Sequence, residues 1–110
     1  MGRITLGEFE ELVLLIVAVL NDNAYGINVK DEILNQTGRK VNISAVHTAL
    51  DRLENKGLLS SYLGGATKTR GGRRKRYFTI STEGVRIIEE TRLMRDKLYS
   101  QISSLNITLQ

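Results

Sequence analysis

Apolar side chains recur along this chain at helical spacing in four stretches, and they alternate with polar ones only in a short region before the last. Residues 12–20 are apolar on every side, so a helix there must be covered all round. The segment Thr5-Leu6-Gly7-Glu8 matches a capping box, which predicts that this helix begins at Leu6. Because 110 residues offer little to wrap it, we expect a helix shared between the core and a partner subunit. The alternative is a helix at the centre of the chain's own core.

The second stretch opens at residues 23–26 and ends at Thr37, because Gly38 is a natural left-handed stop. Tyr25 stands at the start of this helix, where a hydroxyl and free backbone amides could hold a phosphate. The alternative for Tyr25 is a partly buried ring with its hydroxyl at the surface. The expected inward positions are Ile27, Val29, Ile33 and Leu34.

The third stretch covers residues 42–57 and predicts a helix with two different faces. Asn42 is a good N-cap, and Gly57 reads as the left-handed stop. Only residues 39–42 separate this helix from the second, which is typical of a helix-turn-helix. Its apolar face consists of Ile43, Val46, Leu50 and Leu53.

The opposite face of the third helix is short and hydrogen-bonding in its leading turns, where ordinary surface helices have long Glu, Lys or Gln side chains. Such a face suits close approach to base edges in a DNA major groove. The alternative is a core helix with an ordinary solvated face. The residues of the leading turns are Ser44, Ala45, His47 and Thr48.

Residues 58–63 and 77–80 are apolar segments that flank a connector with four glycines, which predicts a hairpin with a flexible tip. Six Lys or Arg side chains lie between Lys68 and Arg76 with no acid among them, so this tip repels itself unless an anion is near. A helix followed by a basic hairpin is the order of a winged helix-turn-helix.

The last stretch begins at a Ser81-Thr82-Glu83 cap and continues past what a winged domain needs to close its core. Leu98, Ile102 and Leu105 recur at spacings of four and three, the seam of a helix that pairs with another helix. The alternative is a frayed amphipathic tail at the last few residues.

These elements predict a mainly α fold with a small β-hairpin, a winged helix-turn-helix with an extended C-terminal dimerisation helix. We expect residues 1–80 to form the DNA-binding body, and residues 81–110 to form the dimerisation helix of the same compact unit.

The composition then narrows the range of possible ligands. The net charge is +4, and the crowding of positive charge in one loop fits an electrostatic footprint for nucleic acid.

With no cysteine and one histidine, the chain has no disulfide framework and no thiolate or transition-metal site, and we expect no cofactor. The apolar run of residues 12–20 is too short to span a bilayer, and no cleavage site follows it. We expect a soluble cytoplasmic protein.

Five segments occur together, in order and at the right spacings: Thr5-Leu6-Gly7, Ala24-Tyr25-Gly26, residues 44–53, Lys56-Gly57-Leu58 and residues 71–77. In them the chain resembles PadR-like transcriptional regulators, in the short branch without a further C-terminal domain. The resemblance implies a homodimeric winged-helix repressor whose third helix enters the major groove and whose wing lies on flanking phosphates.

The resemblance also implies site residues. The DNA-binding positions on the helices are Tyr25, Ser44, Ala45, His47, Thr48, Arg52 and Lys56, and those on the wing are Lys68, Arg70, Arg73, Arg74 and Lys75. The apolar residues of the first and last helices imply a dimer interface formed by Leu12, Leu15, Ile16, Val19, Met94, Leu98, Ile102 and Leu105. The family most often has Tyr where this chain has His47, so that contact is altered, lost or pH-sensitive.

Other function classes are weaker. His47 and Asp51 could pair one turn apart, but a nucleophile, an oxyanion site and an orienting group are missing, so we expect no enzyme. The main alternative is a winged-helix protein-interaction module whose basic wing binds an acidic partner. The sequence assigns neither an operator nor a small-molecule effector, and without Trp it cannot sandwich a planar ligand as some members of the family do.

Overall fold

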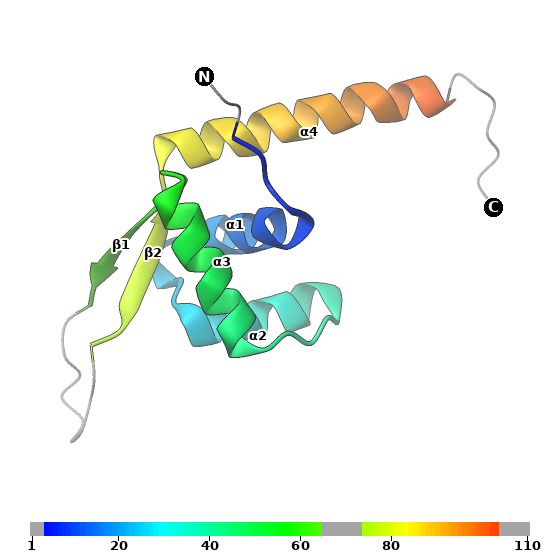
Figure 1. Cartoon of the computed structure of the whole chain (residues 1–110). Helices are drawn as coiled ribbons and strands as arrows, with labels where there is room; N and C mark the ends of the chain where they lie inside the picture. Colours follow the sequence, from blue (N-terminus) through cyan, green and yellow to red (C-terminus); the bar gives the residue numbers. More distant parts are fainter. Residues whose placement is uncertain (1–3, 65–73, 104–110) are drawn as a thin grey trace.

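The computed structural model describes residues 4–64 and 74–103 (Figure 1). Three helices come first: α1 (Glu8–Leu20), α2 (Gly26–Thr37) and α3 (Ile43–Asn55), with a 3₁₀ turn, η1 (Asn21–Asn23), between α1 and α2. A hairpin of β1 (Leu59–Leu63) and β2 (Arg76–Ile80) follows, and the helix α4 (Thr82–Ser103) comes last. The predicted mainly α fold with a small β-hairpin is confirmed.

The core lies where the first three helices meet the base of the hairpin. Each helix contributes the apolar side chains of one face, and Phe78 from β2 closes the cluster beside them. The largest fully buried side chains are Leu14, Ile33, Leu50, Leu53, Leu58, Val13, Val17, Val29 and Val46. Packing of α3 against both α1 and α2 fixes which face of α3 remains outside.

The ends of α2 and α3 follow the predicted capping chemistry. The side chain of Asn42 accepts a hydrogen bond from the Ala45 amide at 2.8 Å, which satisfies one free donor of the first turn of α3. Gly38 and Gly57 both have positive φ, 74° and 78°, as expected for residues that end helices in the left-handed region. Gly38 and Asn42 thus mark the two ends of the turn between α2 and α3.

The predicted start of α1 is wrong by two residues. The helix begins at Glu8 with Gly7 as its N-cap, and the carboxylate of Glu10 accepts from the Gly7 amide. Thr5 is therefore not the cap. Glu8, Glu10 and Glu11 all lie in the first turn, where negative charge is favourable beside the positive end of the helix dipole.

Two of the four predicted inward positions of α2 are also wrong. Val29 and Ile33 are buried, but Ile27 and Leu34 are 55% and 41% exposed. Because α2 is covered by α1 and α3 on one side only, its core stripe is narrower than its apolar pattern suggests. The helical period of the apolar residues does not show how much of the surface of α2 its neighbours α1 and α3 cover.

The hairpin is antiparallel, with Tyr62 opposite Tyr77 and Ser61 opposite Phe78. One more short pairing continues it: Tyr25 forms an isolated bridge with Tyr77, and the Phe78 amide donates to the Ala24 carbonyl at 2.8 Å. We call the hairpin with its connector the wing, and residues 62–64 and 74–78 the wing base. These bonds attach the wing base directly to the start of α2. This attachment brings wing, α2 and α3 to one side of the molecule.

Helix α4 begins as predicted, since the Ser81 hydroxyl accepts from the Gly84 amide at 3.0 Å. Its first half covers the body through the partly buried Ile87 and Ile88. Figure 1 shows the last turns of α4 extending past the other helices. Gly84 is needed where the helix crosses the hairpin, because a Cβ there would lie 2.3 Å from the Leu58 carbonyl oxygen.

Candidate nucleic-acid interface

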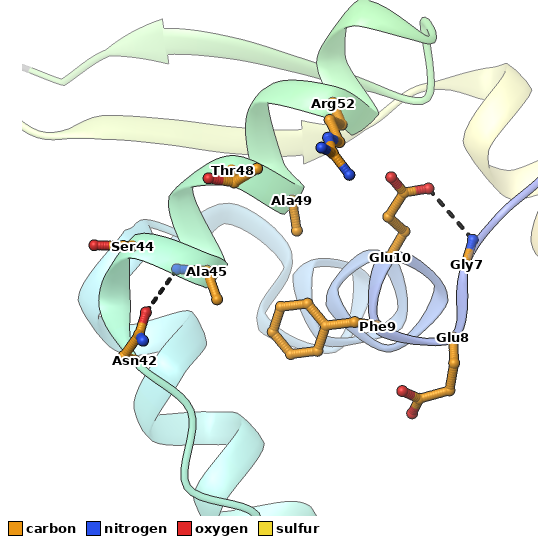
Figure 2. A pocket seen from close by; sticks show the side chains of 10 residues that line it. All are labelled: Gly7, Glu8, Phe9, Glu10, Asn42, Ser44, Ala45, Thr48, Ala49 and Arg52. Atoms are coloured by element: carbon orange, nitrogen blue, oxygen red, sulfur yellow. Dashed lines mark hydrogen bonds between the residues drawn. The ribbon is translucent and has the colours of Figure 1, made fainter.

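The outer ridge of α3 is exposed along its first two and a half turns. Ser44, Ala45, His47, Thr48 and Arg52 are all exposed, as the sequence predicts. Within the described part of the chain, none of their side chains makes a hydrogen bond to another residue. Figure 2 shows Ser44 and Thr48 pointing away from α1. The ridge therefore presents donors and acceptors that are unbonded within the described chain, and Ser44, Ala45 and Thr48 have short side chains.

A groove of about 610 Å³ lies on one flank of this ridge, between α3 and the start of α1 (Figure 2). The ring of Phe9 lies across from Ala45 and Ala49, which form its apolar part. Arg52 reaches from α3 toward Glu10 without a hydrogen bond to it. Small residues on this flank let a neighbouring molecule approach α3 closely.

A second hollow, about 400 Å³, lies on the other flank, where α2 begins and the wing base passes. His47 and Asp51 come from α3, Tyr25 is the N-cap residue of α2, and Lys75 and Arg76 lie at the entry to β2. The ammonium of Lys75 lies 4.2 Å from the centre of the Tyr25 ring, a cation–π distance. The structure thus brings Tyr25, His47 and Lys75, three predicted DNA-binding residues, to one hollow.

Lys56, at the C-terminal end of α3, is bound within the chain. Its ammonium donates to the Glu10 carboxylate at 2.6 Å and to the Thr5 carbonyl at 2.8 Å, so it joins the end of α3 to the start of α1. The bond from Lys56 holds the pKa of Glu10 below its ordinary value, against the opposing effect of burial. Two of the three donors of Lys56 are therefore used inside the chain.

The wing base contains three exposed cations, Arg74, Lys75 and Arg76. Of these, Arg76 pairs with Glu54 at 2.7 Å and donates to the Ser61 hydroxyl. The Ser61 hydroxyl, and then Arg76, lower the pKa of Glu54. The predicted wing residues Lys68, Arg70 and Arg73 lie outside the described residues.

The predicted dimer residues fall into two groups. Ile16 is buried in the chain's own core at 4% exposed, and Leu12 is partly buried. Leu15 and Val19 on α1 are 39% and 60% exposed. On α4, Met94, Leu98 and Ile102 are exposed, and Leu105 lies outside the described residues.

Two residues of this surface were missed as site residues in the sequence. Gly26 lies against His47, and a Cβ on Gly26 would come within 2.5 Å of the imidazole. Tyr77 packs against Tyr25. Both lie in segments that carry the family resemblance, Ala24-Tyr25-Gly26 and residues 71–77, but neither was assigned a role there.

No three His, Cys, Asp or Glu side chains among residues 4–64 and 74–103 gather as a metal site would require. None of the helices in these ranges is both long enough and apolar enough to pass through a bilayer.

The arrangement described above defines a winged helix-turn-helix protein. Residues 14–90 match the model of the transcriptional regulator PadR-like family. The chain belongs to this family of DNA-binding transcriptional regulators, whose members are not generally enzymes. Comparison with curated proteins found no significant match.

Solved structures show the same fold. A PadR-like transcription factor from Bacteroides fragilis superposes with a TM-score of 0.73 at 18% identity, covering 88% of each chain. A PadR family regulator from Clostridium difficile R20291 gives 0.71 at 21% identity, covering 92% of this chain and all of the other. One from Eggerthella lenta gives 0.70 at 23% identity, covering 93% and 88%.

Proposed function

We propose that this chain represses transcription by binding a pseudo-palindromic operator as a homodimer. In this proposal the outer ridge of α3 enters the major groove, and the wing lies on flanking phosphates. The observation that supports it most is the convergence of the α3 ridge, Tyr25 and the wing base on one surface with free side chains. A groove-reading helix and phosphate-binding cations must reach one duplex together.

On α3, Ser44 and Thr48 are one turn apart and extend away from the body, so both can approach base edges or a thymine methyl. Arg52 is exposed one further turn along and has no hydrogen bond within the described chain, so it can bind a phosphate or a guanine. His47 lies beside them against Gly26. Lys56 is omitted from this set because Glu10 and Thr5 hold its ammonium.

On the wing, Arg74 and Lys75 are exposed at the base, and Lys68, Arg70 and Arg73 precede them in the sequence. Cations on a hairpin bind phosphates without selecting bases, so they add affinity to any duplex. The rival function, a protein-interaction module with an acidic partner, uses the same cations. It gives no reason for the short, uncovered side chains on α3.

The dimer in this proposal covers two apolar surfaces at once. On α4, Met94, Leu98 and Ile102 follow the partly buried Ile87 at helical spacing, and all three are exposed. Leu15 and Val19 are exposed on α1. A two-fold contact in which both helices meet a second copy would remove this surface from water. Each dimer would then present two α3 ridges.

The direct test is selection of binding sequences from a pool of random duplexes, followed by electrophoretic mobility shift at low and moderate salt. We expect convergence on a pseudo-palindrome whose half-sites are about 10 base pairs, or a multiple of that, apart. Transcription in vitro from a promoter that overlaps the selected site should fall when the protein is added. No retardation of any duplex at either salt concentration would favour the protein-interaction module.

A further inference from the structure

Three tyrosines from three elements pack in a row at the wing base. Tyr62 of β1 stacks on Tyr77 of β2, with ring centroids 5.6 Å apart and planes 16° apart. Tyr77 in turn meets Tyr25, at the start of α2, edge to face, with centroids 5.4 Å apart. Both geometries are favourable for aromatic pairs. We call Tyr62, Tyr77 and Tyr25 the tyrosine row.

Neighbours on both sides hold the row in place. A Cβ on Gly64 would lie 2.6 Å from Cε1 of Tyr77, so the wing backbone passes directly against that ring. The Gly64 amide also donates to the Lys75 carbonyl at 2.7 Å. At the other end, Gly26 follows Tyr25 and has the His47 ring against it. The contacts therefore run without a gap from the wing to α3.

The row ends in a cation that faces the proposed interface. The Lys75 ammonium lies over the Tyr25 ring in the hollow that also contains His47. A lysine on an exposed hairpin has many rotamers, and ordering it costs entropy. The face of the Tyr25 ring favours one rotamer of Lys75 before any ligand binds. Tyr77 fixes that ring by its edge contact.

We propose that Tyr77 is a positioning residue for DNA binding: through the Tyr25 ring it orients Lys75, and so couples the wing base to α3. This inference rests on the proposed function, since it assumes that the hollow faces a duplex. It differs from that function in its claim that a residue without DNA contact of its own sets the contribution of Lys75. Because the link is made by the aromatic ring, the Tyr77 hydroxyl is dispensable.

A double-mutant cycle on the full chain tests the coupling with a random-sequence duplex. Lys75→Ala alone should weaken binding by about fivefold, the loss of one phosphate contact. Tyr77→Leu alone should produce a similar loss, and Lys75→Ala added to it should then have almost no effect. Tyr77→Phe should restore both the affinity and the effect of Lys75→Ala, which a loss of fold would not predict. Equal effects of Lys75→Ala in the natural chain and in the Tyr77→Leu variant would overturn the inference.

Gly64→Ala provides a second variant in case Tyr77→Leu fails to fold. Its methyl group displaces the Tyr77 ring without removing it, and the residue has no positive φ that an alanine would strain. It too should abolish most of the effect of Lys75→Ala. An undiminished effect in this variant would also overturn the coupling.

Proton NMR gives a readout that needs no DNA. Side-chain protons of Lys75 that lie over the Tyr25 ring should be shifted upfield by its ring current, and the shift should survive Tyr77→Phe but not Tyr77→Leu or Gly64→Ala. Ordinary Lys75 shifts in the natural chain would refute the arrangement itself. If the Lys75 protons are shifted upfield but the protein binds no duplex, the arrangement of the side chains is correct and the proposed function is wrong. The role of the tyrosine row in DNA binding would then fail together with that function.

Discussion

Helices α3 and α4 both expose a polar face, but they use their exposed groups in opposite ways. On α4, Arg86 pairs with Glu83 and Glu90, and Arg92 pairs with Glu89 and Asp96, all within one turn. On α3, Arg52 and the short polar residues around it make no such bonds within the described chain. Arg86 and Arg92 are thus paired within α4 itself, whereas the polar side chains on the ridge of α3 make no hydrogen bond within the described chain.

The apolar residues of the two helices differ as well. The large apolar side chains of α3 are buried or partly buried, whereas Leu98 and Ile102 of α4 stay exposed. Polar groups left free on α3 and apolar groups left free on α4 thus mark two kinds of surface, one suited to DNA and one suited to a second copy. The contrast gives four predictions, taken from the largest expected effect to the smallest.

The largest effect should come from a charge in the apolar face of α4. Leu98→Glu would bury an unpaired carboxylate in the proposed dimer, and we expect a monomer by sedimentation at micromolar concentration. Operator affinity should fall by about 100-fold or more, because one chain then engages only one half-site. Affinity for random duplex should fall much less.

Leu93→Glu is the matched control for this change. The two leucines are 55% and 53% exposed on the same helix, but five residues apart, which places them on different faces. We expect Leu93→Glu to remain dimeric and to bind the operator normally. Equal effects of the two substitutions would show that the face of α4 has no special role.

The next prediction concerns base reading by α3. Thr48→Ala should reduce the discrimination between operator and random duplex by roughly 1 to 3 kcal/mol if a base contact is lost. The measurement is the ratio of the two dissociation constants at one salt concentration. Unchanged discrimination would point to readout of DNA shape, and would weaken the contrast between α3 and α4.

A smaller and less selective effect is expected on the wing. Replacing Arg73 and Arg74 together by Ala should weaken operator and random duplex alike, by about tenfold, and should reduce the salt slope by roughly two units. Arg86→Ala on α4 removes a cation that its own neighbours already satisfy, and it should leave both affinities unchanged. A loss confined to the operator would contradict the assignment of the wing to phosphates.

The smallest effect distinguishes the two cations at the end of α3. Lys56→Met removes the partner of Glu10 and should cost about 1 kcal/mol of stability at pH 7. Because Lys56 lowers the pKa of Glu10 in the folded state, this contribution is complete above the ordinary carboxyl pKa and is lost as pH falls through the lowered value. In urea denaturation, the difference in the free energy of unfolding between the parent and the variant should be smaller at pH 3 than at pH 7.

Arg52→Met is the counterpart of Lys56→Met. Arg52 has no hydrogen bond within the described chain and interacts with Glu10 only through its charge, so its removal should change stability little and weaken DNA binding. Lys56→Met should lower stability and leave DNA binding unchanged. The opposite pattern would exchange the proposed roles of the two residues.

The sequence alone determined the elements and most of their ends, because these depend on local chemistry. Asn42, Gly38 and Gly57 act within a turn of their own positions, and the apolar period of α3 is read directly from its residues. The fold class and the exposed ridge of α3 follow from the same local patterns. The pairing of Lys56 with Glu10 does not, since it joins residues 46 positions apart.

Only the tertiary structure decided which apolar and charged residues remain free. Ile16 and Leu15 are adjacent and equally apolar, yet packing buries the first and exposes the second. The same holds for the exposure of Ile27, the pairing of Lys56 with Glu10 and the packing of the tyrosine row. In each case the outcome depends on where a distant element lies, and a periodic pattern contains no information about the distance or the width of that contact.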